Sequence, residues 1–238
     1  FKDELKNLQL KIYELTKNLL EEHDKNIAIE DKIKLKFKQK PSNESWSKLM
    51  ADINASNELK TLIHCKSIID TFKIIFENPT PFEISTFRAR FPEQGRVIYN
   101  WHQDEGTWYL SNKKEHLNKF PVTLWLSLNG ANKEESIQLV KYSHKKKLFN
   151  HEFVNGQGFF NINEKDSIND NDIFTVEIKT SECVIFHPLT IHRSVPPTKL
   201  SLRPRYTVDI RYYDENFEKD FKVDWKLSTK RALKKIFK

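Results

Sequence analysis

Cysteine, glycine and long apolar runs are all scarce in this sequence of 238 residues. Its two cysteines, Cys65 and Cys183, have no Cys or His neighbour at the spacing of zinc ligands, so neither a disulfide framework nor a structural zinc site is expected. Five glycines exclude a collagen-like repeat. No apolar run approaches the roughly 20 residues that cross a bilayer. We therefore expect no membrane span and a reducing, cytoplasmic environment.

Positive charge is concentrated at one end of the chain. The formal net charge is +7, from 40 Lys and Arg against 33 Asp and Glu. Residues 222–238 contain seven of the basic residues and one acid, a local excess of +6 that leaves +1 for residues 1–221. The body is thus close to neutral, and a nucleic-acid partner is not expected. The tail is expected to form either a solvated helix, with Leu227, Leu233 and Phe237 on its buried side, or a contact with nucleic acid or lipid.

Apolar residues are frequent enough to build one large core. They make up 38% of the chain, and a protein of this length buries roughly 70% of the surface that it exposes when unfolded. Residues 1–238 are therefore expected to form a single domain. Apolar residues recur at three- and four-residue steps over residues 3–23, and helical patterns follow at 43–50 and 58–76. Residues 1–80 are expected to be mainly helical.

The remainder of the chain has the composition of strands. From about residue 82, short runs rich in β-branched and aromatic residues are separated by segments too short for crossover helices. Helices followed by such strands predict an α+β fold, mainly β. Residues 81–214 would form a double-stranded β-helix (a jelly roll, or cupin-like fold) with the helices on one side, and residues 215–238 the basic tail. The predicted strands are residues 82–91, 96–101, 121–128, 136–142, 173–179, 183–187 and 206–213.

Three candidate metal ligands stand at the ends of predicted strands. His102 and Asp104 are two residues apart, so both side chains leave the same face, and His192 follows a later strand. Two imidazoles and one carboxylate on one face of an ion leave three coordination positions open, which suits Fe(II) that binds a cosubstrate together with O₂. His187, which precedes a proline, is expected to be structural, and His144 is expected in a solvated loop.

A strand near the end of the body carries several cations. Alternation along residues 203–212 places Arg205 and Arg211, with the two polar residues between them, on one face. A guanidinium inside an apolar barrel needs a carboxylate partner, because an unpaired buried charge is costly. The distal carboxylate of 2-oxoglutarate is such a partner. Arg205 is the first candidate for this role, with Arg203 and Arg211 as alternatives.

These residues resemble the phytanoyl-CoA dioxygenase-like branch of the Fe(II)/2-oxoglutarate oxygenases, which includes the ectoine hydroxylases. The resemblance covers residues 84–213. Trp-His-Gln-Asp at 101–104, followed by Thr-Trp at 107–108, is similar to the iron-binding motif of the family. It implies that His102 and Asp104 are iron ligands.

The resemblance extends to the cosubstrate site. His192-Arg193-Ser194 resembles the family's His-Gly-Ser motif, which implies His192 as the third iron ligand and Ser194 as a hydroxyl donor to 2-oxoglutarate. Arg205 resembles the family's cosubstrate arginine. Trp125 belongs to a segment similar to the strand that lines the cosubstrate pocket, although tryptophan at such a position is often plain core.

Three features depart from the family pattern. The stretch Gly-x-Leu-x-x-x-Pro-Gly-Ser-His is replaced at residues 136–144, where only the final Ser-His is kept. The interval from His192 to Arg205 is longer than in many members, which makes Arg203 a rival anchor. Arg193 stands where glycine is usual, so the rim of the pocket is expected to be more cationic.

The resemblance implies a function. The chain would be an Fe(II)/2-oxoglutarate-dependent dioxygenase that uses O₂ to hydroxylate a small-molecule substrate and releases succinate and CO₂. Asp104 argues against halogenation, because halogenating relatives carry a small residue there to admit chloride. The substrate is expected to be anionic or zwitterionic, and the residues expected to contact it are Arg88, Arg90, Trp108 and Arg193.

Two other functions stay open at this point. The first is a nucleic-acid demethylase of the AlkB type, because the spacing of Arg205 and Arg211 matches an Arg-x5-Arg signature. The second is a non-catalytic binding protein built on the same jelly roll.

Overall fold

The computed structural model describes residues 1–22, 24–82, 85–90, 99–106, 121–154, 159–162, 168–196 and 203–214. The helices α1 to α5 all precede β1, as predicted for residues 1–80, and a further helical turn covers residues 104–106. The helical elements are α1 (Lys2–Thr16), η1 (Lys17–Leu19), α2 (Ile29–Lys32), α3 (Asn43–Asn54), α4 (Asn57–Ile63), α5 (Lys66–Phe72), η3 (Ser143–Lys145) and η5 (Asp170–Asp172). The strands are β1 (Thr80–Pro81), β2 (Thr86–Arg90), β3 (Val122–Ser127), β4 (Ile137–Val140), β5 (His151–Val154), β6 (Phe159–Ile162), β7 (Ile173–Thr175), β8 (Cys183–Phe186), β9 (His192–Ser194) and β10 (Arg205–Tyr213).

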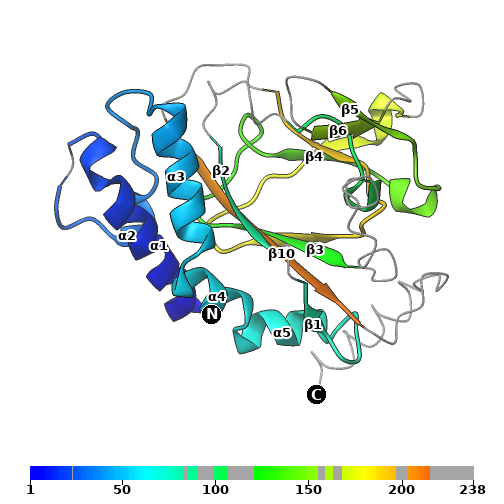
Figure 1. Cartoon of the computed structure of the whole chain (residues 1–238), viewed down its shortest axis with the longest axis horizontal. Helices are drawn as coiled ribbons and strands as arrows, with labels where there is room; N and C mark the ends of the chain where they lie inside the picture. Colours follow the sequence, from blue (N-terminus) through cyan, green and yellow to red (C-terminus); the bar gives the residue numbers. More distant parts are fainter. Residues whose placement is uncertain are drawn as a thin grey trace.

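Two facing sheets carry the site. In the larger sheet β10 pairs with β3, which pairs with β8, while β1 and β2 pair with different parts of the other edge of β10. The smaller sheet has the order β7-β4-β9, and β5 pairs with β6. All of these pairings are antiparallel. Figure 1 shows the helices on one side of the β2-β10-β3 layer and β4 to β6 on the other, so the predicted α+β jelly roll is confirmed.

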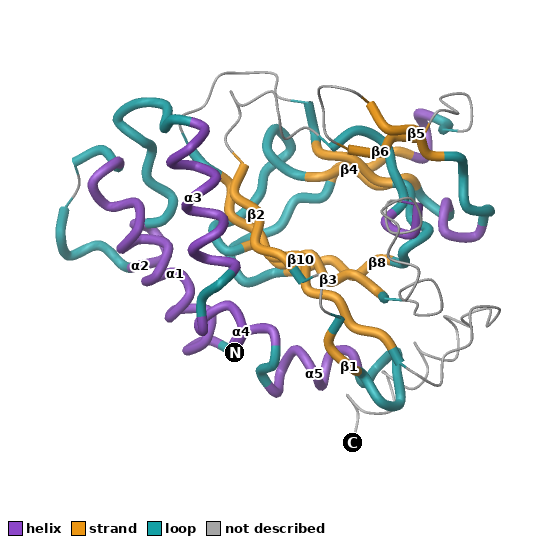
Figure 2. Tube along the Cα trace, viewed as in Figure 1, coloured by secondary structure: helices purple, strands orange, loops and turns teal. Residues whose placement is uncertain are grey.

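The helices cover the outer face of the larger sheet (Figure 2). Phe72 of α5 stacks on Tyr212 of β10, with ring centroids 4.5 Å apart. The indole of Trp46 on α3 donates a hydrogen bond of 3.2 Å to the carbonyl oxygen of Ala89 on β2. Both contacts lie in a continuous apolar core that joins α1 to α5 with β2, β3 and β10. The helices therefore hold the outer face of this sheet rigidly while its inner face is left for the site.

One predicted helix is divided in two. Residues 58–76 form α4 and α5, because Cys65 between them has an extended backbone and is the N-cap of α5. Ser42 and Ser56 begin α3 and α4, each accepting a hydrogen bond from the backbone N–H three residues later. Within the segments described, no helix has both the length and the apolar character needed to cross a membrane.

Most predicted strands are present with shorter bounds. The strand predicted at 173–179 is wrong beyond Thr175, where β7 ends. Of the strand predicted at 96–101, residues 99–101 are described and lie outside any strand. Strands β1, β5, β6 and β9 were not predicted; β9 is only the polar triplet His-Arg-Ser, which lacks a period-two apolar pattern. The basic tail at 215–238 and Trp108 lie outside the described residues.

Candidate active site

The inner face of the larger sheet is polar. Along β10, Tyr206, Val208 and Ile210 belong to the core beneath the helices, so the alternate residues from Arg205 to Arg211 face the smaller sheet, as predicted. On β3 the same alternation turns Trp125 inward. The chain thus places arginine, aspartate and hydroxyl side chains between the two sheets.

His102, Asp104 and His192 meet in this interior. The backbones of the two histidines pair directly, with each N–H donating to the other's carbonyl oxygen at 3.0 Å. The Nε2 atoms of His102 and His192 lie 4.0 and 3.7 Å from Oδ1 of Asp104. All three side chains are buried, and one ligand atom from each lies within 4.8 Å of the others. The three predicted ligands are therefore brought together in a cluster that could hold a metal ion.

Backbone carbonyls orient both imidazole rings. Nδ1 of His102 lies 2.6 Å from the carbonyl oxygen of Asn100, and Nδ1 of His192 lies 2.9 Å from that of Thr190. Because a carbonyl can only accept, each Nδ1 carries a hydrogen, and each Nε2 is the ring nitrogen directed at the cluster. Burial and the neighbouring His192 hold the pKa of His102 well below its usual value, so this ring is neutral and ready to ligate.

The other oxygen of Asp104 is held by protein groups. Oδ2 accepts a hydrogen bond of 2.7 Å from the Thr123 hydroxyl and faces Nη2 of Arg211 at 3.3 Å. Burial opposes the charged form of Asp104, but Arg211, the two imidazoles and the hydroxyl outweigh it and hold its pKa below the usual value. Asp104 is therefore an anion with Oδ1 directed at the histidines.

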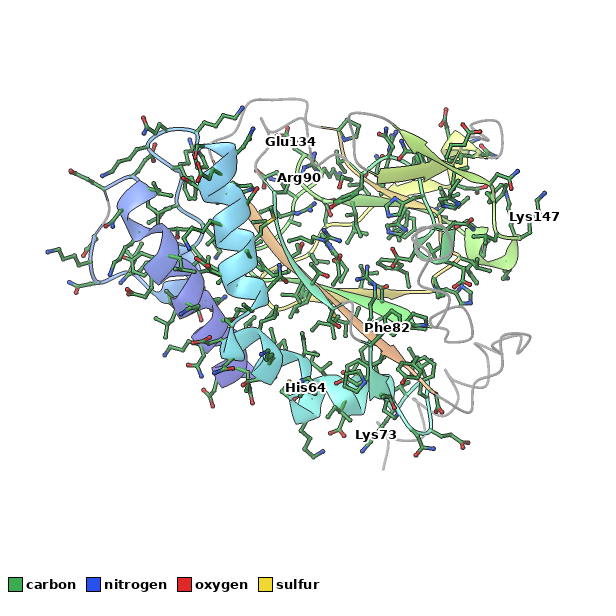
Figure 3. The ribbon with its side chains drawn as sticks, in the orientation of Figure 1. His64, Lys73, Phe82, Arg90, Glu134 and Lys147 are labelled. Atoms are coloured by element: carbon green, nitrogen blue, oxygen red, sulfur yellow. The ribbon has the colours of Figure 1, made fainter. Side chains whose placement is uncertain are left out.

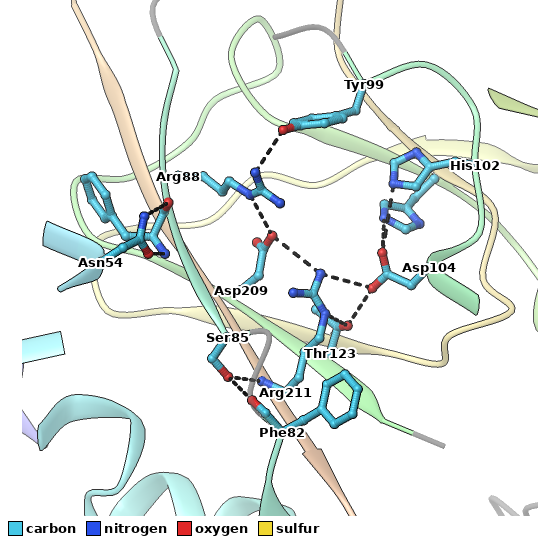
Figure 4. A network of polar contacts seen from close by, with 12 residues as sticks. Asn54, Phe82, Ser85, Arg88, Tyr99, His102, Asp104, Thr123, Asp209 and Arg211 are labelled. Carbon is cyan, nitrogen blue, oxygen red and sulfur yellow. Dashed lines mark hydrogen bonds and ion pairs between the residues drawn. The ribbon is translucent and has the colours of Figure 1, made fainter. Parts of the chain in front are cut away.

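A chain of charged groups continues from this carboxylate (Figure 4). Arg211 lies 3.6 Å from Asp209, which in turn lies 3.4 Å from Nε of Arg88. Arg88 donates a hydrogen bond of 2.9 Å to the hydroxyl of Tyr99. The side chain of Arg88 is 33% exposed, so the network runs from the buried cluster toward solvent.

Arg205 lies at the opposite end of β10 from Arg211. Its Nη1 donates to the carbonyl oxygens of Glu135 and Ser136 at 2.6 and 3.1 Å, and its Cζ lies 5.4 Å from the ring centroid of Trp125. Burial and the nearby Arg90 lower the pKa of Arg205 to about 9. The guanidinium is thus held in place without a carboxylate partner among the residues described.

Several buried polar atoms near Arg205 have no hydrogen-bond partner in the described part of the chain. The register of β10 with β2 and β3 and the contact with residues 135–136 bring them to this end of the interior. Buried polar atoms without partners are costly unless a ligand satisfies them. They are Nε of Arg205, Nη1 of Arg90, the hydroxyls of Ser127, Ser136 and Thr207, and Oε2 of Glu135.

Ser194 and Arg193 lie on opposite faces of β9. The register with β4 pairs Ser194 with Ile137, and His192 with Leu139, two residues of the inner apolar cluster. Arg193 points the other way, where its Nε donates to Gln138 at 2.7 Å and its Cζ stacks 4.3 Å from the Trp101 ring centroid. Ser194 therefore shares the inner face with His192, whereas Arg193 does not.

The remaining sequence candidates take different places. Arg203 is half-buried and donates to the carbonyl oxygen of Asn129 at 2.8 Å. His187 is buried, and its Nδ1 accepts a hydrogen bond of 3.0 Å from the N–H of Leu189. His144 is half-buried in the short turn η3, with its ring 5.7 Å from that of His187, so its predicted solvated loop is only partly correct.

Sequence reasoning missed the support behind the cluster. Gln103, between two of the candidate ligands, is fully buried and bonds three backbone groups, the carbonyls of Lys147 and Leu189 and the N–H of Phe149. The N–H of Gln103 itself donates to His151 at 2.9 Å. The only signal in the sequence for this role was a glutamine between two candidate ligands. Its partners could not be predicted, because they lie far from it along the chain.

Solved structures with a similar fold include three proteins that align with most of this chain. ThoJ, a non-heme monooxygenase, shares 11% identity over 100% of this chain and 88% of its own, with a TM-score of 0.58. EvdO2 from Micromonospora carbonacea var. aurantiaca, complexed with 2-oxoglutarate, shares 12% identity over 91% of this chain and 85% of its own, with a TM-score of 0.54. SnoK, a non-heme alpha-ketoglutarate-dependent carbocyclase from nogalamycin biosynthesis, shares 17% identity over 96% of this chain and 82% of its own, with a TM-score of 0.52.

Sequence comparison identifies the family. No curated protein matches the sequence at a significant level. The sequence profile of phytanoyl-CoA dioxygenase (PhyH) matches residues 2–203, which is most of the chain. The profile match, the jelly roll and the buried His-Asp-His cluster agree with one another. The chain therefore belongs to the phytanoyl-CoA dioxygenase family of iron- and 2-oxoglutarate-dependent oxygenases.

Proposed function

We propose that this oxygenase hydroxylates a small molecule at an Fe(II) ion bound by His102, Asp104 and His192. The observation that carries the proposal is the gathering of these three buried ligand atoms within 4.8 Å of one another. Two oriented imidazoles and one carboxylate fit Fe(II) and leave positions for a cosubstrate and O₂. When bound, iron with 2-oxoglutarate and O₂ supplies the oxidation, in which succinate and CO₂ are released and an oxygen atom enters the substrate.

Arg205 is the proposed partner of the distal carboxylate of 2-oxoglutarate. It is buried, its Nε is without a partner among the residues described, and it is fixed by two backbone carbonyls and by Trp125. Ser194, on the same inner face as His192, is the proposed hydroxyl donor. Arg203 is less suited because the residue is less buried than Arg205 and its Nη2 bonds the Asn129 carbonyl.

Apolar residues around the proposed iron site exclude water from it. Trp125, Ile137, Leu139 and Phe186 belong to an apolar cluster on the inner face, and the Phe186 ring lies 4.7 Å from that of His192. Such a wall excludes water, which strengthens the electrostatic contacts inside. Asp104 occupies the position that a halogenating enzyme keeps free for chloride, so hydroxylation is the proposed outcome.

The proposed substrate is a small anionic or zwitterionic molecule. Arg88 supports this class, because it is partly exposed at the open end of the charge network and is held by Asp209 and Tyr99. A cation fixed in this way can receive an anionic group with little loss of side-chain entropy.

Anaerobic titration with Fe(II) and then 2-oxoglutarate tests the proposal. The chelate of both should give a weak visible charge-transfer band in the wild-type protein and none in His102→Ala or His192→Ala. A screen of small carboxylates and amino acids for stimulated succinate formation then tests the substrate class. A full-strength band in both histidine variants would contradict the proposed iron site.

A further inference from the structure

Two buried arginines lie side by side at one end of the interior. Arg90 of β2 and Arg205 of β10 are direct partners in the antiparallel register, and only 4% and 6% of their surfaces are exposed. Both belong to the inward-facing set of their strands, because Ala89 and Tyr206 beside them lie in the core under the helices. Two guanidinium groups of like charge are therefore buried next to each other.

Both side chains reach across to the same point of the smaller sheet. Nη2 of Arg90 donates to the carbonyl oxygen of Val195, and Nη1 of Arg205 donates to that of Ser136 at 3.1 Å. These two acceptors are neighbours, since the N–H of Val195 donates to the Ser136 carbonyl at 3.0 Å. Figure 3 shows Arg90 at the end of the sheets where Glu134 also lies, away from His64 and Lys73 on the helices.

The pair lacks one negative charge. Within the described ranges neither arginine forms an ion pair with a carboxylate. Two acids lie near Arg205: Asp209, which is already paired with Arg88 and Arg211, and Glu135, whose backbone carbonyl Arg205 contacts. Nη1 of Arg90 and Nε of Arg205 have no hydrogen-bond partner, and the hydroxyl of Ser136 beside them has none either. Asp209 is balanced by its own two arginines, so among the described residues at this end Arg90, Arg205 and Glu135 leave a single positive charge, which one carboxylate would neutralise.

We propose that Arg90 is a second ligand of the distal carboxylate of 2-oxoglutarate, acting together with Arg205. This inference rests on the proposed function. The donors available to the carboxylate are Nη1 of Arg90, Nε of Arg205 and the Ser136 hydroxyl. Arg90, which the sequence grouped with Arg88 as a substrate residue, is thereby assigned to the cosubstrate. Arg88 differs from it because Asp209 and Tyr99 already hold its guanidinium.

The experiment compares two ligands of equal chain length. 2-Oxoglutarate and 2-oxopentanoate share the keto acid group, but only the first has a distal carboxylate. Dissociation constants are measured by calorimetry on the Mn(II)-loaded full chain under anaerobic conditions, for wild type, Arg90→Gln and Arg90→Lys. Lys133→Gln is the matched control, because it removes an exposed positive charge, on a side chain 74% exposed, two residues before Glu135.

Arg90→Gln should raise the dissociation constant of 2-oxoglutarate about 10- to 100-fold, which is the value of one charge-assisted hydrogen bond, and leave that of 2-oxopentanoate unchanged. Arg90→Lys, which keeps the charge, should lose less affinity for 2-oxoglutarate, and Lys133→Gln should lose none. Equal binding of 2-oxoglutarate by wild type and both Arg90 variants would overturn the inference. An equal loss of affinity for 2-oxoglutarate and 2-oxopentanoate would overturn it too. Failure of the wild-type protein to bind 2-oxoglutarate would instead refute the proposed function. If Arg90→Gln does not fold, the same comparison with Arg90→Lys decides.

Discussion

Arg211 faces Oδ2 of Asp104 at 3.3 Å, and the Thr123 hydroxyl donates to the same oxygen at 2.7 Å. The other oxygen, Oδ1, is the one nearest to the two imidazoles. The protein therefore occupies one side of this carboxylate and leaves a single oxygen for the metal. This division explains how three side chains can hold an ion while keeping other coordination positions open.

Loss of these supports should weaken metal binding without removing any ligand. We expect Arg211→Gln and Thr123→Val each to lower Mn(II) affinity about 10- to 100-fold, as for other residues that orient metal ligands. Arg211→Lys should recover part of the loss, because it keeps the charge next to Asp104. Metal titration followed by electron paramagnetic resonance measures the effect. Wild-type affinity in both Arg211→Gln and Thr123→Val would show that the contacts to Oδ2 do not position the ligand.

The two rival anchors of the cosubstrate should separate clearly. Arg205→Gln is expected to raise the apparent KM for 2-oxoglutarate roughly 30- to 800-fold, because a buried charge-assisted contact is lost. Arg203→Gln should change it little, since Arg203 is half-buried and bonds a backbone carbonyl. Steady-state succinate formation at varied 2-oxoglutarate, with melting curves to check folding, measures both. Small and equal changes of this KM in the two variants would show that neither arginine binds the distal carboxylate, and Arg211 would be the next candidate.

Gln103 should be a stability residue at the centre of the site. Replacement by leucine keeps the volume but leaves three backbone groups without their partner, the buried N–H of Phe149 and the part-buried carbonyls of Lys147 and Leu189. We expect the free energy of unfolding to fall by about 3 kcal/mol. Urea unfolding of the metal-free protein measures the change, with exposed Gln39→Leu as control. A loss no larger than that of the control would refute this role.

The three residues of the proposed iron site could be predicted because their signals are local. The alternation from Arg205 to Arg211 follows from the period of a strand alone. His102 and Asp104 are close in the sequence, but the strand period assumed for them is wrong, because His102 forms an isolated bridge with His192 and Asp104 begins a helical turn. The chemistry of imidazole and carboxylate ligands then limits the choice of metal. These features need no knowledge of which strands are neighbours.

The supporting contacts could not be predicted because they depend on strand register. Arg211 lies opposite Thr123, and Arg205 opposite Arg90, only because β10 pairs with β3 and β2 in one alignment out of several. The sequence shows Arg90 and Arg88 as alternate residues of one strand and does not distinguish them. Their different partners across the sheets separate the two roles.

His187 should make the metal-free protein sensitive to acid. Burial, with a contribution from His144, lowers the pKa of His187 to about 3, whereas in the unfolded chain it is about 6.5. Its Nδ1 accepts the Leu189 N–H at 3.0 Å, so protonation there would also break a hydrogen bond. Between these two pKa values the unfolded chain binds a proton that the folded chain does not. The free energy of unfolding should therefore fall as the pH drops from about 6.5 toward about 3, by at most about 1.4 kcal/mol per pH unit from this group.

His187→Asn isolates this contribution. The asparagine oxygen can still accept from the N–H two residues later, but it does not titrate. We expect urea unfolding in the presence of a chelator to show a flatter dependence on pH, between about pH 7.5 and about pH 4.5, for the variant than for wild type. Above the unfolded pKa, where His187 is neutral in both states, the two slopes should coincide. Parallel pH profiles over the whole range would mean that His187 is protonated equally in the folded and unfolded chains, and that its burial does not shift its pKa.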